Sequence, residues 1–546
     1  MGATISCDSQ GSASTLEPRI IVALDESPVG YLSNKISIAL ITATGYYLGT
    51  KLGFALTPPQ SPISTLWPPN AILLGILLLI SFRNWWVALL VVLPIHLLIQ
   101  LRVGVPLTTS VGWFIGNVSE ALLGAALVRR FTDPRRMFES VRGTLIFLAF
   151  AVIAAPLATT FLDAAIVILT GRSQDYWLIW TERLLSNCLA ELIFAPIIVT
   201  TLSTPLSLFQ SAKPVRYLEA LALGAGLFVT SFLAFGFSHP QFHDSPALIY
   251  FPLSLLVWAA FRFGALGLGI SLLAISVISI EGALHGTGSF AFGPEGHVLS
   301  LQILLSTAAV PLVILHALIT ERKQAGDAVA NLSGRLIAAQ EEERSRIARE
   351  IHDDYQQRLA LLANDLDMLS REVGDLSGDA NRRIHQLWNQ ISELGSDMHS
   401  LSHQLHSSTL ENLGLTAGIR AFCHEFEEHQ GLHITLTSSE LPRTVPPDLA
   451  LCLFRVAQEA LRNVVRHSGA NHADVKLEWD GRKLRLVVSD SGKGFDPKSR
   501  STNAGIGIRS MEERLRLLGG QLQLHSQPSH GTRIEASVLL PNQIAG

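Results

Sequence analysis

A histidine followed by an aspartate, with a glutamine five residues after the histidine, is the arrangement with the most defined chemistry in this sequence. His352, Asp353 and Gln357 lie in the run QEEERSRIAREIHDDYQQRL, residues 340–359. Residues four apart share a helix face, so Asp353 and Gln357 are predicted to point the same way beside His352. An imidazole can accept a phosphoryl group, the carboxylate can orient the ring and take its proton, and the amide can position water. Taken alone, the run also fits a solvated charged helix with one surface histidine.

The residues around His352 predict a long helix with one apolar face. No proline occurs in residues 321–373. Apolar residues recur at helical spacing, as in a bundle: Ile347, Ile351, Leu359, Leu362 and Leu366. His352 is about 100° around the helix from Ile351 and should reach solvent. Residues 375–381 (DLSGDAN) read as a turn and about 382–406 as a second helix. Two helices bury little surface, so we expect a homodimeric four-helix bundle.

Two blocks near the C-terminal end carry residue types that suit a nucleotide and a hard metal ion. In FRVAQEALRNVVRHSGA, residues 454–470, Glu459 and Asn463 lie one helical turn apart, and their oxygens suit Mg²⁺. One turn further, Arg466 or His467 can face phosphate. In LRLVVSDSGKGFDP, residues 484–497, a strand ends at Asp490, which could accept a hydrogen bond from an exocyclic amine such as that of adenine. The next glycines permit close backbone approach: Gly492 and Gly494.

Two further blocks complete the nucleotide pattern. In NAGIGIRSMEERLRLLGG, residues 503–520, Gly505 and Gly507 form a turn into a helix whose N-terminus suits phosphate. In HGTRIEASVLLP, residues 530–541, Gly531 and Thr532 lead into a closing strand. Each block alone matches ordinary turns by chance. Their order and spacing together predict an ATP site.

Composition divides the chain into an apolar half and an ordinary polar half. Of its 546 residues only 16% are charged, against about 25% in typical soluble domains, and the deficit lies in residues 33–320. The net charge of −4 gives no case for direct nucleic-acid binding. Four scattered cysteines indicate neither a disulfide framework nor a zinc site: Cys7, Cys188, Cys423 and Cys452. Residues 1–32 form a polar tail without signal-peptide features.

Apolar runs of roughly 20 residues predict a membrane domain of about eight to ten spans. The runs are 34–56, 66–82, 85–102, 109–130, 142–170, 176–202, 216–237, 246–262, 264–283 and 299–320. Lys and Arg favour cytoplasmic loops, and they gather in alternate loops, which places both termini in the cytoplasm. The basic loop residues are Arg83, Arg129, Arg130, Arg135, Arg136, Arg142, Lys213, Arg216, Arg322 and Lys323.

Ionisable residues inside the spans suggest function, since their burial in a bilayer is costly. They are Glu120, Asp163, Glu182, Arg183 and Glu191. An i,i+8 spacing places Arg183 and Glu191 on similar faces. Two interpretations stay open for each residue: contact with a stimulus, or an ion pair that locks helices together. His96 and Gln100 share a face but are not read as metal ligands.

The apolar half resembles the membrane-associated sensor (MASE-type) domain found ahead of bacterial signalling outputs. The resemblance rests on LWPPNAILLGILLL, GNVSEALLGAALVRRF and ELIFAPIIV, within residues 34–320. It implies that a stimulus, whose identity the sequence does not give, is sensed within or near the bilayer of a bacterial inner membrane.

The helix around His352 resembles the phosphoacceptor domain of nitrate/nitrite-sensor and hexose-phosphate-sensor histidine kinases. The match includes Arg344, Arg349, His352, Asp353, Gln357 and Leu359, and continues to the "LGL" at 413–415, with Ile351 where leucine is common. The resemblance implies that His352 is phosphorylated, that Asp353 assists the kinase, and that Gln357 orients water for dephosphorylation of the partner.

The four C-terminal blocks resemble the ATPase domain that histidine kinases share with gyrase-type topoisomerases and heat-shock chaperones. The family's N-box falls on Glu459 and Asn463, its first glycine box on 490–494, and its second on Gly505 and Gly507. ATP would lie under a short lid, residues 497–504, which lacks the aromatic position of some relatives. Thr532 and His467 complete the predicted ATP contacts, and Mg²⁺ is the expected metal.

These observations predict a multi-domain membrane sensor histidine kinase. The fold class is a polytopic α-helical membrane domain, then a two-helix dimerisation and phosphoacceptor hairpin, then an α+β GHKL-type ATPase sandwich. The expected domains are a tail (1–32), the membrane sensor (33–320), the signalling and phosphotransfer helices (321–410), a connector (411–444) and the ATP-binding domain (445–541).

The expected partner is a separate response regulator with a receiver domain, because no receiver domain follows Gly546. The resemblance implies that it carries a LuxR-type DNA-binding domain. Three alternatives remain. The membrane half could be a transporter-like receptor, although no paired half-repeats are visible. The cytoplasmic part could act mainly as a phosphatase of the regulator. A simple ATP hydrolase with Glu459 as its base is disfavoured by the motif at His352.

Overall fold

The computed structural model describes most of the chain and divides it into two compact units. The described residues are 32, 34–58, 61–204, 214–236, 246–285, 287, 297–373, 378–405, 408–442, 445–496 and 506–540. The units are Met1–Ala325 and Gly326–Gly546. Nearly all of the predicted tail, residues 375–377 of the predicted turn, the whole predicted lid (497–504) and Gly505 lie outside the described residues.

The first unit consists of helices only, among the residues described. Its early helices are α1 (Lys35–Ala55), α2 (Pro68–Leu79), α3 (Trp85–Arg102), α4 (Leu107–Phe131), α5 (Val141–Phe147), α6 (Ala155–Leu169) and α7 (Tyr176–Ser203). The later ones are α9 (Pro214–Ser231), α10 (Tyr250–Arg262), α11 (Gly264–Leu284) and α12 (His297–Glu350). A π-helical segment, Leu148–Ala154, joins α5 to α6.

Seven helical stretches in the described part of this unit and its continuation are long and apolar enough to cross a membrane. They contain α3, α4, the joined α5–α6, α7, α9, α11 and the start of α12. The chain is therefore a multi-pass membrane protein. The predicted spans at 66–82 and 246–262 correspond to shorter apolar helices, and α1 is not among the seven.

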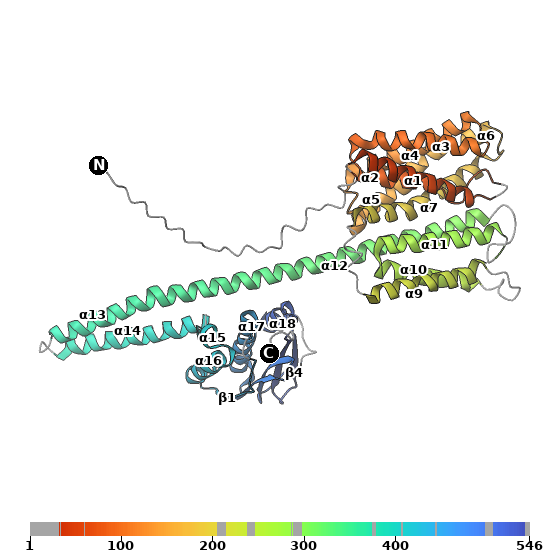
Figure 1. The fold of residues 1–546 in the computed structure, drawn as a ribbon. Helices are drawn as coiled ribbons and strands as arrows, with labels where there is room; N and C mark the ends of the chain where they lie inside the picture. Colours follow the sequence, from red (N-terminus) through yellow and green to blue (C-terminus); the bar gives the residue numbers. More distant parts are fainter. Residues whose placement is uncertain are drawn as a thin grey trace, which may run out of the picture. The chain divides into compact units, whose positions relative to one another are not determined.

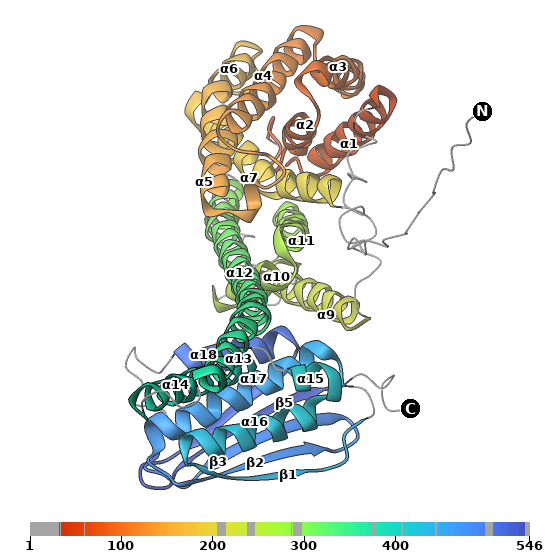
Figure 2. The same ribbon diagram turned by 90° about the vertical axis from the view of Figure 1, so that its left-hand side faces the viewer.

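Helix α2 is a short helix enclosed by longer ones. All of its 12 residues are buried, and it packs against α1, α4 and α7; Figure 2 shows it among α1, α3 and α4. Pro68 and Pro69 occupy its first two positions, where a missing N–H leaves no helical hydrogen bond unmade. Twelve residues extend about 18 Å, well short of the ~30 Å hydrocarbon core. Helix α2 is thus too short to cross the hydrocarbon core by itself, and its C-terminal carbonyls are capped by Arg129 in the last turn of α4.

The second unit opens with a helical hairpin. After α12 ends, a π-helical turn, Ile351–Tyr355, leads into α13 (Gln356–Val373), and α14 (Gly378–Leu405) packs antiparallel beside it (Figure 1). Apolar residues at helical spacing produce this hairpin. The sequence predicted its second helix at about 382–406, and the structure has it at Gly378–Leu405.

A five-stranded mixed sheet forms the rest of the second unit. Its strands are β1 (His433–Ser438), β2 (His472–Trp479), β3 (Lys483–Asp490), β4 (Gln521–Ser526) and β5 (Thr532–Leu539), in the order β1-β2-β3-β5-β4. Strands β1 and β2 are parallel, and the other pairs are antiparallel. Its helices are α15 (Ser408–Leu413), α16 (Leu415–Gln430), α17 (Pro447–Asn463) and α18 (Ile506–Leu517), and they lie on one face of the sheet (Figure 2). This two-layer arrangement confirms the predicted fold class.

One hydrophobic core holds the sheet and its helices together. Alternate residues of β2 and β3 point into this core, as the two-residue period of a strand requires. They meet the apolar stripe of α17. The residues that are at most 1% exposed include Val475 and Leu477 of β2, Leu484 and Leu486 of β3, and Leu453 and Leu461 of α17. Residues 411–444, expected as a connector, contribute to the same core through Leu415, Ile419, Phe422 and Ile434. The core of the ATP-binding fold therefore begins before residue 445.

Candidate phosphotransfer and nucleotide sites

The phosphoacceptor candidate His352 lies in the π-helical turn and is exposed. Its neighbour Ile351 is buried, so the predicted seam accounts for the exposure of the imidazole. The rings of His352 and His399 of α14 lie 6.5 Å apart. Nδ1 of His399 lies 3.1 Å from Nε2 of Gln356. The second helix of the hairpin therefore forms one wall beside His352.

The π-helical turn changes the geometry that an α-helix would give to Asp353 and Gln357. Both side chains are exposed, like His352. A π-turn contains one more residue than an α-turn, so residues four apart no longer lie directly above one another. Oγ of Ser402 donates to the Ala348 carbonyl at 3.0 Å, which satisfies an acceptor next to the turn. Among the described residues, no hydrogen bond or ion pair links His352 to Asp353 or Gln357.

The predicted metal-binding residues lie at the end of α17. Glu459 and Asn463 are half-buried on one face of the helix, and a second π-helical turn, Val464–Ser468, carries Arg466 and His467 into solvent. A Cβ atom at Gly507 would overlap Oε1 of Glu459. The start of α18 therefore lies directly against Glu459, and only glycine permits that approach.

The first glycine block forms a tight loop after β3. Oδ1 of Asp490 accepts from the Gly492 N–H at 2.9 Å, and the Lys493 N–H donates to the Ser468 carbonyl at 2.9 Å. A Cβ at Gly492 would overlap that carbonyl oxygen. The loop thus joins the strand that bears Asp490 to the end of the turn that follows Asn463.

Thr532 begins β5 directly opposite Asp490 on β3. Gly531 has a φ of 78°, and a Cβ there would overlap the Asp490 carbonyl oxygen. A positive φ costs glycine little, whereas other residues avoid it. The strand ends therefore bring Asp490 and Thr532 together, as the sequence blocks predicted.

A cavity of about 670 Å³ opens at these strand ends, within the size range of small-molecule sites. Its lining includes Asp490, Thr532 and two residues that the sequence analysis missed, Asp496 and Ser526. Oγ of Ser526 lies 3.0 Å from both the Gly531 oxygen and Oγ1 of Thr532. Glu459, Asn463 and His467 are not among the lining residues, and no sequence motif distinguishes Ser526.

A buried ion-pair cluster links α12 to the ATP-binding fold inside the second unit. Glu341 lies 2.8 Å from Nη2 of Arg455 on α17 and 2.7 Å from Nη1 of Arg514 on α18. The side chains are 15%, 5% and 10% exposed. Burial lowers the pKa of Arg455, and the adjacent Glu341 carboxylate opposes that effect. Sequence reasoning missed this cluster, although an arginine in the apolar stripe of α17 was visible.

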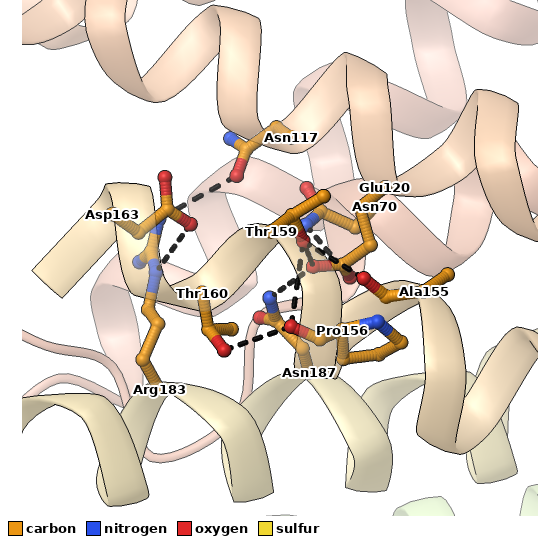
Figure 3. A network of polar contacts seen from close by, with 10 residues as sticks. All are labelled: Asn70, Asn117, Glu120, Ala155, Pro156, Thr159, Thr160, Asp163, Arg183 and Asn187. Carbon is orange, nitrogen blue, oxygen red and sulfur yellow. Dashed lines mark hydrogen bonds and ion pairs between the residues drawn. The ribbon is translucent and has the colours of Figure 1, made fainter.

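Two groups of bonded side chains in the membrane domain contain ionisable residues (Figure 3). Nε of Arg183 lies 3.2 Å from Oδ2 of Asp163, so the arginine pairs across helices and not with Glu191 on its own helix. Glu120 accepts hydrogen bonds from Asn70, Thr159 and Asn187. Glu182 is half-buried.

A helical membrane domain joined to a phosphoacceptor hairpin and a nucleotide-binding sandwich is the architecture of a sensor histidine kinase. The family model MASE1 matches residues 38–323, more than half of the chain, and the chain belongs to this family. The model named Histidine kinase matches residues 343–410, and the model of histidine kinase-, DNA gyrase B- and HSP90-like ATPases matches residues 449–543. These matches confirm the predicted resemblances.

Two curated relatives share the C-terminal part of the chain. The sensor histidine kinase MctS of Rhizobium johnstonii is 37% identical over 218 residues, 40% of this chain and 47% of that protein. The signal transduction histidine-protein kinase/phosphatase DegS of Brevibacillus brevis is 30% identical over 233 residues, 41% of this chain and 60% of that protein. The chain thus spans about half the length of these relatives.

Among solved structures, the histidine kinase domain of the Erythrobacter litoralis blue-light activated histidine kinase EL346 is similar to part of the chain. It is 18% identical, with a TM-score of 0.23, over 33% of this chain and 94% of that domain. The assignment of the fold rests instead on the sheet order and the family models.

Proposed function

We propose that the protein is a membrane-bound sensor histidine kinase that transfers the γ-phosphoryl group of ATP to His352. The observation that carries the proposal is an exposed imidazole on a helical hairpin, followed in the same unit by an ATPase fold with a cavity at Asp490 and Thr532. A donor site and an acceptor are thus both present in the cytoplasmic half of one chain.

ATP binding is proposed at the ends of β3 and β5. Among the described residues nothing bonds to Oδ2 of Asp490, so this oxygen can accept from the exocyclic amine of adenine, with Thr532 opposite it. The glycine loops would bring α17 and α18 close to the phosphates, and the N-terminus of α18 at Ile506 suits their charge. His467 and Arg466 are exposed where phosphates would lie.

Mg²⁺ fits the oxygens of Asn463 and Glu459, which lie one turn apart, half-buried, on the face of α17 next to α18. Such a hard ion prefers oxygen ligands and would neutralise phosphate charge when bound. The chain's own part is to hold both side chains at the end of a helix whose opposite face is locked in the core.

In the transfer, one imidazole nitrogen of His352 forms a bond to the γ-phosphorus as the bond to the leaving oxygen of ADP breaks. Asp353 orients the ring and takes the proton that the imidazolium would otherwise carry. Catalysis is mainly positioning and charge neutralisation. The phosphoryl group then passes to an aspartate of a separate response regulator, proposed to be of the LuxR type.

A homodimer is proposed because the hairpin exposes an apolar face in a single chain. The apolar residues that are at least 41% exposed are Leu361, Leu362, Met368, Leu369, Leu387, Trp388, Leu394 and Leu401. A contiguous apolar surface of this kind marks an interface, and a second hairpin would complete a four-helix bundle. The bacterial inner membrane and a cytoplasmic kinase are proposed from loop charge and from the need for ATP.

The direct test is labelling with γ-labelled ATP. His352→Gln is expected to abolish acid-labile incorporation while nucleotide binding persists, because the acceptor alone is removed. His385→Gln is the matched control, an exposed histidine on α14 that should leave labelling unchanged. Retained labelling in His352→Gln contradicts the proposal.

A phosphatase activity on the regulator is the second candidate. The relative DegS is named a kinase/phosphatase, and Gln357 lies exposed two residues after the π-helical segment. An amide there can hold a water molecule for hydrolysis of the regulator's acyl phosphate. The two activities are not exclusive.

A further inference from the structure

A buried group of oxygen atoms lies in the membrane domain where α2, α4 and α7 meet. Oε1 of Glu120 accepts from Nδ2 of Asn70 at 3.1 Å, and Oε2 accepts from Nδ2 of Asn187 at 2.7 Å and from Oγ1 of Thr159 at 3.0 Å. Figure 3 shows these side chains converging on the Glu120 carboxylate from three directions. Glu191 lies one turn after Asn187 on the same helix, α7.

The group lies deep within the apolar helices. Glu120 is the fourteenth of the 25 residues of α4, and Glu191 is the sixteenth of the 28 residues of α7. Each carboxylate residue is only 1% exposed. Asn70 is the third residue of α2, so the N-terminus of this short helix also lies in the interior. The positive end of the α2 dipole therefore lies beside the Glu120 carboxylate and favours its charged form.

The buried charges of the described membrane domain do not balance. Three acidic residues are buried, Glu120, Asp163 and Glu191, whereas Arg183 is the buried residue of permanent positive charge. Arg183 is paired with Asp163. Glu120 and Glu191 are therefore left without a cationic partner among the residues described. Such burial is costly unless a positive charge accompanies it.

The unsatisfied atoms around these two carboxylates are oxygens. Both asparagines must turn their NH₂ groups to Glu120, because a carboxylate only accepts hydrogen bonds. Their own oxygens then have no donor: Oδ1 of Asn70 and Oδ1 of Asn187 are buried without a hydrogen bond, as is Oε2 of Glu191. Asn70 and Asn187 are at most 1% exposed. Carbonyl and carboxylate oxygens attract hard cations.

The composition of the group restricts which cation fits. The Cys188 thiol donates to the Val152 carbonyl and is engaged elsewhere. Among the described residues, no three His, Cys, Asp or Glu side chains gather as a transition metal or a calcium ion would require. Two carboxylates and two amides suit a singly charged ion instead.

We propose that Glu120, Glu191, Asn70 and Asn187 bind one small monovalent cation, sodium or hydronium, inside the membrane domain. The cation supplies one of the two missing positive charges and a partner for the three unsatisfied oxygens. Because the four residues come from α2, α4 and α7, an occupied site holds these helices together.

Other titratable groups near the site are accounted for. Asp163 of α6 and Arg183 of α7 pair with each other, and Cys188 bonds to backbone. Tyr46 of α1 and His96 of α3 lie 3.0 Å apart and bond to each other. Glu120 and Glu191 are thus the groups whose charge a bound cation would change.

A regulatory consequence rests on the proposed kinase function. Nε2 of Gln302 on α12 donates to the carbonyls of Thr65, before α2, and of Glu182, on α7. These bonds connect the start of α12 to the two elements that the cation would hold. Cation occupancy could therefore act on the helix that leads to His352.

The test measures thermal unfolding of the full chain in lipid nanodiscs, and it does not depend on kinase activity. Sodium chloride, compared with choline chloride at equal ionic strength and pH 8, should raise the midpoint by a saturable amount of about 2–4 °C. Glu191→Gln keeps the side-chain volume and should lose this rise. Glu182→Gln, a half-buried carboxylate on the same helix, is the control and should keep it.

The second arm identifies the occupant. If hydronium is bound, sodium has no effect, but the midpoint in choline chloride rises from pH 8 to pH 6 more in the native protein than in Glu191→Gln. Glu120→Gln replaces that variant should Glu191→Gln fail to fold. A native midpoint with neither dependence overturns the proposal, as does a sodium effect that persists unchanged in both variants.

Discussion

At the scale of single residues, we predict that Asp353 and Gln357 set the balance between adding and removing phosphate. Both are exposed next to His352. Asp353→Asn removes the proton acceptor but keeps the shape, and should lower autophosphorylation about 10²-fold or more. Gln357→Ala should leave autophosphorylation near native and reduce dephosphorylation of the regulator. Both rates are measured with purified regulator. Equal loss of both activities in either variant would show that the two roles are not separate.

The buried thiols of the ATP-binding fold should be inert. Burial raises the pKa of Cys423 and of Cys452 to about 12, so almost no thiolate exists at pH 8 and the thiolate is the reactive form. Iodoacetamide should label both only after denaturation, as mass spectrometry can show. Because the folded pKa is raised, the unfolded thiols ionise first, and stability is lost as pH rises from about 9 toward 12. Rapid labelling of the native protein would contradict this burial.

Individual site residues were predictable where the physics is local. The apolar spacing that buries Ile351 also gives the exposure of His352. The π-helical turn was not predictable, because the local sequence fits regular α-helical spacing. The hydrogen bond beside the turn joins Ala348 to Ser402, which is 54 residues away in the sequence. The role of the glycines in ATP binding stays a prediction, and in the structure Gly492 and Gly531 are required by close approach to protein carbonyls. Ser526 has no local signal, because only strand pairing brings it to Thr532.

At the scale of elements, the Glu341 cluster should hold the ATP-binding fold against α12. Glu341→Gln leaves Arg455 and Arg514 partly buried without a full counter-charge, and loss of one partner of a buried pair is destabilising. We expect faster backbone hydrogen exchange in α17 and α18 and a loss of about 1–3 kcal/mol. Glu342→Gln, an exposed neighbour, is the control. Identical exchange in the two variants would contradict a structural role for the cluster.

The sequence did not predict the right element where an apolar run can form either a membrane span or a short enclosed helix. The run at 66–82 has the composition of a span, but its helix ends after 12 residues at Leu79. Pro68 and Pro69 mark its start, and hydropathy does not reveal that other helices enclose it. The segment 411–444 has few motifs, so its strand β1 was missed. Strand β1 is parallel to β2, and such long-range pairing leaves little trace in local sequence.

At the scale of the whole molecule, composition determines the main division. Charge depletion over residues 33–320 predicted a membrane domain, and the four glycine and asparagine blocks predicted the ATPase sandwich. Both predictions are confirmed by the family matches at 38–323 and 449–543. What composition does not provide is the meeting of side chains from separate helices, such as Asn70 of α2, Glu120 of α4 and Asn187 of α7.

The continuity of α12 leads to a prediction about the complete chain. This helix runs from His297 to Glu350, one residue before the π-helical turn that contains His352. Each inserted residue rotates the following helix by about 100°. Inserting two alanines after Gly334 rotates the hairpin by about 200°, whereas four alanines rotate it by about 40° relative to the original phase.

If rotation of α12 sets the kinase state, the two-residue insertion should change basal autophosphorylation several-fold more than the four-residue insertion, even though it lengthens the helix less. The measurement is the initial rate of His352 labelling in proteoliposomes, normalised to nucleotide binding. Adding the same alanines between α13 and α14, after His352, is the control, since α12 is unchanged there. Equal rates for both insertions after Gly334 would exclude transmission by helix rotation, because the two insertions differ in phase by about 160°. A larger change for the four-residue insertion would instead indicate piston-like displacement, which depends on the length added.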